Sequence, residues 1–261
     1  MSWGYYSEVT GNPTGGTYRG TSWTYGVDYT TRNGLWAGTG VVPELAALSA
    51  SRMPNRVTAV DAEVEDLIAG GVHVVIAAGN DFYKGDLSTG NDYNNSVVYG
   101  GLTYFYHRGS SPHSDNSLMV GNIDTGVQND QDKTYQSSSR GPRVNMWAPG
   151  TNIFSCVSTT NVYSGLDYPP NTSFKIAKLN GTSFAAPQVA GVSALIAGAN
   201  PQISPAQLKQ KITSDAKNVI YDTASDTDYD QFGTSLLGAD NKMLFNKYGR
   251  QPFIFKNIGL G

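Results

Sequence analysis

The chain has 261 residues, of which 15% are charged, and its formal net charge at pH 7 is −3. This balance excludes the basic footprint of a nucleic-acid-binding protein, and no unbroken apolar run approaches the ~18 residues that span a bilayer. We therefore expect neither nucleic acid nor membrane as a partner. Residues 1–6 show no signal-peptide pattern, which leaves the localisation open, and the single cysteine, Cys156, excludes an internal disulfide.

The first part of the chain predicts irregular structure followed by a helix. Residues 1–56 contain glycine turns and aromatics, and predict loops with short strands and at most a short helix over 43–51. Residues 58–69 predict a helix, because four apolar residues recur on one helical face. These residues are Val60, Val64, Leu67 and Ile68. The glycine pair at 70–71 supplies the stop.

A buried strand follows over residues 72–77, an apolar run rich in β-branched side chains. Such a run is typical of a parallel strand covered on both faces. Helix, glycine pair and buried strand together indicate an α/β fold. Residues 81–116 then form a polar insertion rich in tyrosine and glycine, and loops of this length are usually functional or disordered.

The second part predicts three more strands and two helices. The strands are expected over 117–123, 144–148 and 152–157. An alanine-rich helix is expected over 183–199, and another begins at Ser204, which forms a capping box with Gln207. After residue 218 the pattern weakens into an acidic tail.

The most informative string is Leu-Asn-Gly-Thr-Ser-Phe-Ala-Ala-Pro-Gln-Val-Ala-Gly, residues 179–191. Ser183 starts a helix there, and the unpaired N–H groups and positive dipole of a first helical turn stabilise an oxyanion. Small residues at 185, 186, 190 and 191 predict that this helix approaches the sheet closely. Gly-Thr-Ser alone indicates only a core helix capped by Ser183. The whole string resembles the serine motif of the subtilase family, and Gln188 replaces a commoner, non-catalytic histidine.

Three further strings occur in the family's order. Val-Val-Ile-Ala-Ala-Gly-Asn at 74–80 resembles the strand that ends in the oxyanion asparagine. Ser-Ser-Arg-Gly-Pro at 138–142, followed by Ala-Pro-Gly at 148–150, resembles a pair of structural motifs. Met-Ser-Trp-Gly at 1–4 is similar to a segment that pairs with substrate backbone.

The resemblance implies a role for each matching residue. Ser183 is expected to be the nucleophile, and Asn80 with the Ser183 N–H is expected to form the oxyanion hole. The residues expected to bind substrate are Ser2, Trp3, Gly4, Ala78, Gly79 and Thr182.

The aspartate and histidine motifs of the family precede the Ser-x-Gly segment, which begins here at residue 2. Asp124-Thr125-Gly126 spells the aspartate motif but follows Asn80, so we expect a turn there. His73 lies in a predicted core strand. His107 and His113 lie in the insertion near the expected specificity pocket, and are weak candidates for a replacement base. A serine without a base is a poor nucleophile, so this chain alone is expected to be inactive.

The resemblance implies a three-layer α/β subtilisin-like fold with a mainly parallel sheet, whose N-terminal strands are missing from this chain. We expect a partial domain over 1–217, with insertions near 5–56 and 81–116, and a C-terminal extension over 218–261 that packs on it. Without the family's N-terminal strands, the 72–77 strand would expose apolar edges to water. An upstream segment or a separate chain is therefore expected to complete the sheet. Because residue 1 falls inside a family strand, a truncated gene model, an internal start or a split protein is expected.

The sequence therefore predicts part of a serine endopeptidase that hydrolyses polypeptides through an acyl-enzyme, with aspartate and histidine from outside this chain. The alternative is an inactive structural or binding component of a larger assembly, such as a virus particle. A lipase-like hydrolase is disfavoured because Gly-x-Ser-x-Gly is absent. No cofactor or metal is assigned. The family often binds structural calcium, and Asp81, Asp86 and Asp92 carry suitable oxygens, but loop carboxylates are usually only solvated.

Overall fold

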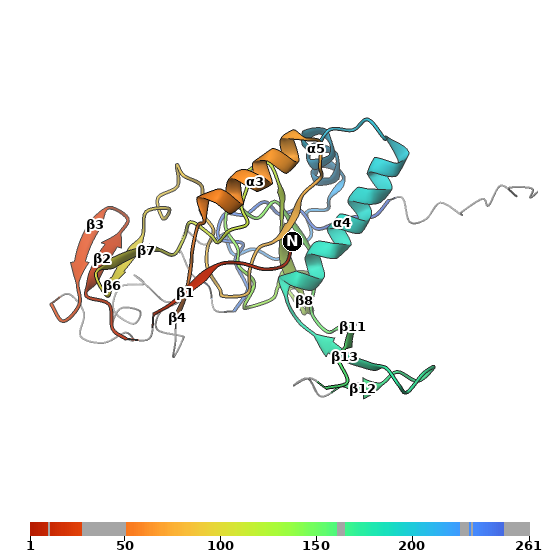
Figure 1. Cartoon of the computed structure of the whole chain (residues 1–261), viewed down its shortest axis with the longest axis horizontal. Coiled ribbons are helices and arrows are strands. Elements are labelled where there is room, and N and C mark those ends of the chain that lie inside the picture. Colours follow the sequence, from red (N-terminus) through yellow and green to blue (C-terminus); the bar gives the residue numbers. More distant parts are fainter. Residues whose placement is uncertain (10, 28–50, 161–164, 225–229, 231, 248–261) are drawn as a thin grey trace, which may run out of the picture.

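A small parallel sheet lies at the centre of the chain (Figure 1). The computed structural model describes residues 1–9, 11–27, 51–160, 165–224, 230 and 232–247. Strands β10 (Met146–Pro149), β8 (Leu118–Gln128) and β5 (Val75–Ala77) lie side by side in that order and are parallel. Strand β9 (Gln131–Thr134) folds back antiparallel on β8. The strands predicted over 117–123 and 144–148 are confirmed as β8 and β10, whereas the parallel strand predicted over 72–77 is shorter, since β5 begins at Val75 and Val72 is 46% exposed.

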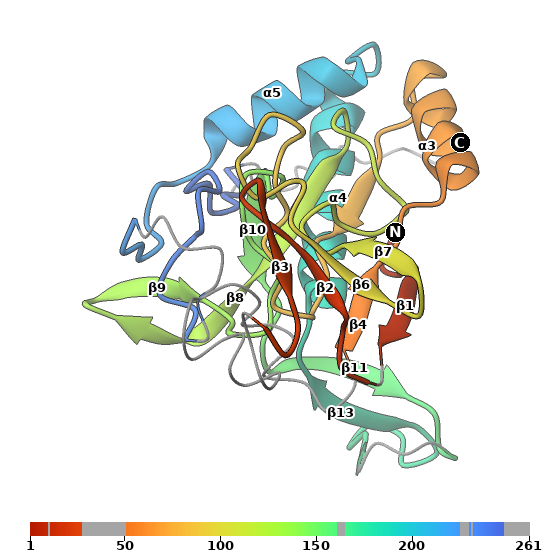
Figure 2. The same cartoon turned by 90° about the vertical axis from the view of Figure 1, so that its left-hand side faces the viewer.

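Helices cover both faces of this sheet (Figure 2). Helices α4 (Thr182–Ala199) and α5 (Pro205–Asp215) pack in one core with Val75 of β5. The neighbouring Val74 and Ile76 pack against Val64 of α3 (Thr58–Ala69). Because successive residues of a strand point to opposite faces, α3 lies across the sheet from α4 and α5. The predicted three-layer α/β architecture is confirmed.

Helix α3 ends and helix α5 begins where their sequence signals place them. Gly71, with φ of +89°, follows the last turn of α3. Ser204 and Gln207 form both hydrogen bonds of the capping box at the start of α5. The predicted inner face of α3 is wrong in one respect, since Val64 is 2% exposed but Leu67 is 41% exposed. Helix α3 lies at the rim of the sheet, which covers only part of its apolar face.

Helix α4 packs its serine-proximal half closely on the sheet. Ala185 and Ala186 are buried there. The prediction that Ala190 and Gly191 also face the sheet is wrong, because both lie on the exposed side of the helix. Within the described residues, α4 is also the one helix whose length and mean hydropathy would allow it to cross a membrane, although no unbroken apolar run is visible there. It reaches that hydropathy through alanine, glycine and aliphatic residues on both its buried and its exposed sides.

The two predicted insertions meet in a second sheet, at the left of Figure 1. Its strands are β3 (Thr21–Thr24), β2 (Gly15–Tyr18), β6 (Ser96–Tyr99) and β7 (Leu102–Phe105), all antiparallel. A separate pair joins β1 (Tyr6–Val9) to β4 (Ser51–Pro54). Residues of both insertions share one aromatic core, which contains Val9, Trp23, Met53, Tyr83, Val97 and Tyr106. The helix predicted over 43–51 lies almost wholly outside the described residues.

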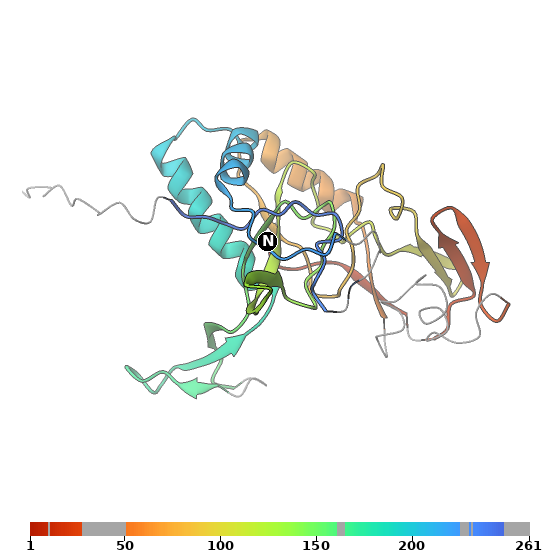
Figure 3. The same ribbon diagram turned by 180° about the vertical axis from the view of Figure 1, so that it is seen from behind.

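Two regions after the central strands complete the fold. Strands β11 (Ile153–Val157), β13 (Lys175–Leu179) and β12 (Leu166–Asp167) form an antiparallel arm that projects from the body, as Figure 3 shows. Residues 242–244 pack beside β10, where Trp147 exchanges backbone hydrogen bonds with Lys242 and Leu244.

The turn predicted at Asp124-Thr125-Gly126 is wrong. Strand β8 continues through these residues to Gln128, because β9 pairs with its second half. Asp124 lies 3.9 Å from the ammonium group of Lys133 on β9. The residues that spell the family's aspartate motif are therefore part of a hairpin.

Candidate active site

Ser183 is the second residue of α4, directly after Thr182. The cap of this helix is Gly181, so Ser183 does not serve as the capping residue. Its side chain is half-buried, and its Oγ lies 3.5 Å from the carbonyl oxygen of Ser2, its only hydrogen-bond partner in the part of the chain that the structure describes. The N–H of a second helical residue has no acceptor within the helix, and it lies at the positive end of the helix dipole.

Asn80 follows the carboxyl end of β5 and is tied to the start of α4. Its Oδ1 accepts hydrogen bonds from the backbone N–H of Thr182 at 2.8 Å and from the Thr182 hydroxyl at 3.0 Å. The same hydroxyl accepts a hydrogen bond from the Gly79 N–H at 3.2 Å. Since the oxygen end of the Asn80 amide is occupied, its NH₂ group is the end available to a ligand.

Thr182 lines the cleft, and it also has a structural place that the sequence did not indicate. Its side chain is fully buried and joins the strand that carries Asn80 to the helix that carries Ser183. Sequence reasoning did not find this link. The only signal for it is the threonine of Gly-Thr-Ser itself.

One cleft, with an empty volume of about 510 Å³, contains the predicted site residues apart from Ala78. Arg52 of β4 and Ser110 of the long insertion line it, and the predicted residues in it come from three other segments: the N-terminal residues, the end of β5 and the start of α4. From these segments come Ser2, Trp3, Gly4, Gly79, Asn80, Thr182 and Ser183. Ala78 lines an adjoining pocket. The structure thus brings Ser183 and Asn80 to one opening, although they are distant in the chain.

The N-terminal residue holds its segment against the sheet. The Met1 nitrogen donates a hydrogen bond to the Val75 carbonyl at 2.6 Å, and the Ala77 N–H donates to the Met1 carbonyl at 2.9 Å. These contacts continue the sheet beyond β5 by one residue and place Ser2 next to Ser183.

A second polar group of the cleft was not found from the sequence. Asp81 was considered only as a calcium ligand, but it lies in the cleft with Tyr6 and Arg52. Burial raises the pKa of the Asp81 carboxyl, and Arg52, 3.4 Å away, partly offsets this. Burial and the nearby Asp81 raise the pKa of Tyr6 to about 12, so Tyr6 stays a neutral hydrogen-bonding group.

The three carboxylates considered for calcium have different hydrogen-bond and ion-pair partners. Asp92 is fully buried and forms ion pairs with Arg19 at 2.7 Å and Lys84 at 2.6 Å, whose charges hold its pKa well below the usual range against the effect of burial. Asp86 accepts hydrogen bonds from the backbone N–H groups of Leu87 and Asp92. No group of three or more histidine, cysteine or acidic side chains suited to a metal occurs among the described residues.

The histidines of the chain lie away from the cleft. His107 is buried, with its Nδ1 2.8 Å from the Lys84 carbonyl oxygen. His113 is buried with its Nε2 3.2 Å from Asp115, and His73 is half-buried just before β5. None of the three lines the cleft of Ser183. Within the described residues, Ser183 therefore has no imidazole or carboxylate as a hydrogen-bond partner.

Comparisons with known proteins agree on one family. The model of the Subtilase family matches residues 1–249. Subtilisin DY of Bacillus licheniformis is 29% identical over 82% of this chain and 61% of its own length. Serine protease AprX of Bacillus subtilis strain 168 is 27% identical over 69% of this chain and 37% of its own length. A solved structure of a cold adapted subtilisin-like serine proteinase is 24% identical, covers 83% of this chain and 62% of that chain, and has a TM-score of 0.46.

The chain thus spans less than two thirds of the length of these two curated relatives. The family match nevertheless extends over nearly the whole chain, and it includes the end of β5 and the start of α4 that meet in the cleft. With its parallel sheet, its serine at a helix start and this match, the chain belongs to the subtilase family.

Proposed function

We propose that this chain is the serine-bearing part of a subtilisin-like endopeptidase, which hydrolyses peptide bonds through an acyl-enzyme. The aspartate and histidine of the catalytic triad would come from sequence outside this chain. The observation that carries the proposal is the arrangement of Asn80 and Ser183 in one cleft, with the Asn80 oxygen held by Thr182. That bond leaves the amide N–H groups of Asn80 to serve an oxyanion.

In the proposed reaction, Ser183 Oγ attacks the carbonyl carbon of the scissile peptide while the histidine takes its proton. The carbonyl oxygen becomes an oxyanion, which accepts hydrogen bonds from the Ser183 N–H and from Asn80 Nδ2. Collapse of this intermediate releases the amine, which takes the proton from the histidine. Water then attacks the acyl-serine in the same way and restores Ser183.

The open edge beside β5 supports the need for a completing segment. Beyond β5 the sheet continues only through the hydrogen bonds of Met1 in the described residues. An added strand or helix at this edge would lie next to Ser183, because Ser2 links the two places. A base delivered from that side would reach Ser183 Oγ.

A fluorophosphonate probe tests the proposal, because it reacts only with an activated serine. The chain is expressed alone and together with the sequence that lies upstream of it in its gene, and the site of labelling is found by peptide mass mapping. We expect rapid labelling at Ser183 in the completed protein, at least 100-fold slower labelling of the chain alone, and none in Ser183→Ala. A folded, completed protein that stays unlabelled would refute the proposal and favour an inactive structural or binding component of a larger assembly.

A further inference from the structure

We propose that the pocket beside the Ser183 cleft selects an acidic side chain of the polypeptide substrate, and that Arg143 is the residue that sets this preference. The inference rests on the proposed function, because it assumes that a peptide lies in the cleft. It concerns binding, so it can be tested apart from the reactivity of Ser183.

The pocket adjoins the cleft and is narrow, with a cavity volume of about 30 Å³. The two share part of their walls, through Trp3, Tyr6, Ala77 and Ser110. A substrate residue whose carbonyl approaches Ser183 can therefore extend its side chain into this pocket. The far wall comes from the long insertion, with Lys84, Gly85 and Gly109 among its residues.

The charged residues that line the pocket are all cationic. They are Lys84, Arg140 and Arg143, and no aspartate or glutamate is found among the described lining residues. Two of the cations have strong partners outside the pocket wall. Lys84 lies 2.6 Å from Asp92, and Arg140 lies 3.0 Å from Asp230.

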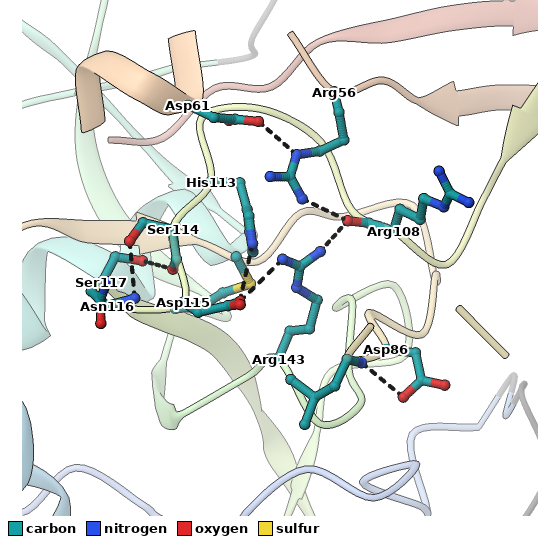
Figure 4. A network of polar contacts seen from close by, with 12 residues as sticks. Arg56, Asp61, Asp86, Arg108, His113, Ser114, Asp115, Asn116, Ser117 and Arg143 are labelled. Atoms are coloured by element: carbon teal, nitrogen blue, oxygen red, sulfur yellow. Dashed lines mark hydrogen bonds and ion pairs between the residues drawn. The ribbon is translucent and has the colours of Figure 1, made fainter. Parts of the chain in front are cut away.

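Arg143 is less well compensated. Figure 4 shows its guanidinium between Asp115 and the Arg108 carbonyl. Its side chain is only 5% exposed, and its one ion-pair partner among the described residues, Asp115, lies 3.3 Å away with 75% of its side chain in solvent. Its guanidinium also donates to the Arg108 carbonyl, but its Nε is buried and has no hydrogen-bond partner in the part of the chain that the structure describes. Burial, followed by the nearby charge of Arg56, lowers the pKa of Arg143 to about 10.

A carboxylate in the pocket would correct this imbalance. A buried cation with a solvent-screened partner gains most from an anion that is itself shielded from water. A glutamate side chain suits the remaining walls, because its methylene groups would contact the apolar surface of Met119 and Val144. A lysine side chain would meet the like charge of Arg143 and is disfavoured by the same wall.

The test measures binding of fluorescein-labelled hexapeptides by fluorescence anisotropy at low salt. Four alanine-flanked peptides differ at one residue, which is Glu, Gln, Lys or Phe. Glutamate and glutamine have the same shape, so their ratio isolates the charge. We expect the Glu peptide to bind at least tenfold more tightly than the Gln peptide, and the Lys peptide to bind most weakly. In Arg143→Met the Glu-to-Gln ratio should fall to within twofold of one, while Lys178→Met on the exposed arm should keep the wild-type ratio.

Equal binding of the Glu and Gln peptides to the wild-type chain, tightest binding of Phe, or binding of none at millimolar concentration would overturn the proposal. If Arg143→Met fails to fold, the wild-type ratio and its loss at 1 M salt still decide the question. Fluorophosphonate labelling separates the two proposals. If the protein is labelled but shows no preference for the Glu peptide, only the proposal for the pocket is refuted. If it shows the preference but is not labelled, only the proposal that Ser183 is a nucleophile is refuted.

Discussion

The hydroxyl of Thr182 offers the sharpest test of how the cleft is held together. Valine has nearly the same shape but cannot form a hydrogen bond, so Thr182→Val removes the bond to Asn80 Oδ1 and the acceptor of the Gly79 N–H. A lost neutral hydrogen bond costs about 1 kcal/mol, and an unsatisfied buried donor costs about 1–3 kcal/mol. Allowing for local relaxation, we expect the free energy of unfolding to fall by about 2 kcal/mol.

The same substitution should also weaken the proposed oxyanion site. Asn80 Oδ1 would keep only the backbone N–H of Thr182, at 2.8 Å, so its amide would be less firmly oriented. We expect about tenfold slower fluorophosphonate labelling of Ser183 in the completed protein, well below the ~100–1,000-fold effect of removing an oxyanion donor.

Urea unfolding measures the stability change, and timed labelling measures the reactivity. Thr182→Ser is the matched control, because it keeps the hydroxyl and loses only a methyl group. If Thr182→Val unfolds at the wild-type urea concentration, or if Thr182→Ser loses as much as Thr182→Val, the inferred role of the hydroxyl is wrong.

Two further predictions concern stability. Leu208→Ala in α5 should lower the free energy of unfolding by about 2–4 kcal/mol, since Leu208 is 1% exposed, whereas Leu195→Ala, at a side chain 43% exposed, should cost less than half as much in the same urea titration. Burial, reinforced by Arg143, lowers the pKa of His113 to about 2 from 6.5, so between these values the unfolded chain binds a proton that the folded chain does not. The free energy of unfolding should therefore fall as the pH decreases below about 6, by up to about 1.4 kcal/mol per pH unit from this group. His113→Gln should reduce this dependence on pH. If the variant and the wild type show the same dependence between pH 4.5 and 7.5, the inferred role of His113 is wrong.

Local signals were sufficient for the positions of the helices and of the central strands along the chain. The capping box at Ser204 and the glycine pair after α3 act within a few residues, so the sequence alone places these ends. The apolar run before Asn80 predicts its strand because a parallel strand must be covered on both faces. The motif strings likewise identified the residues that meet in the cleft.

Pairings between distant segments were not visible in the sequence. The two insertions are separated by α3 and β5, yet β2 pairs with β6 and both share one aromatic core. The extension of β8 through Asp124 depends on β9, and a local Asp-Thr-Gly pattern gives no sign of that partner. Such contacts depend on the packing of whole elements. The pairing of β9 with β8 therefore outweighed the local turn signal at Asp124.

The sequence by itself determined the family resemblance, the α/β layers and the identity of Ser183 and Asn80, because these follow from short motifs and from periodicity. Only the tertiary structure decided what surrounds them: the burial of Thr182 between strand and helix, and the three cations of the adjoining pocket. The physical reason is that burial and charge compensation depend on which distant residues share a wall. How far a partner compensates the charge of an arginine, for example, depends on how much solvent screens that partner, and not on the arginine's neighbours in the chain.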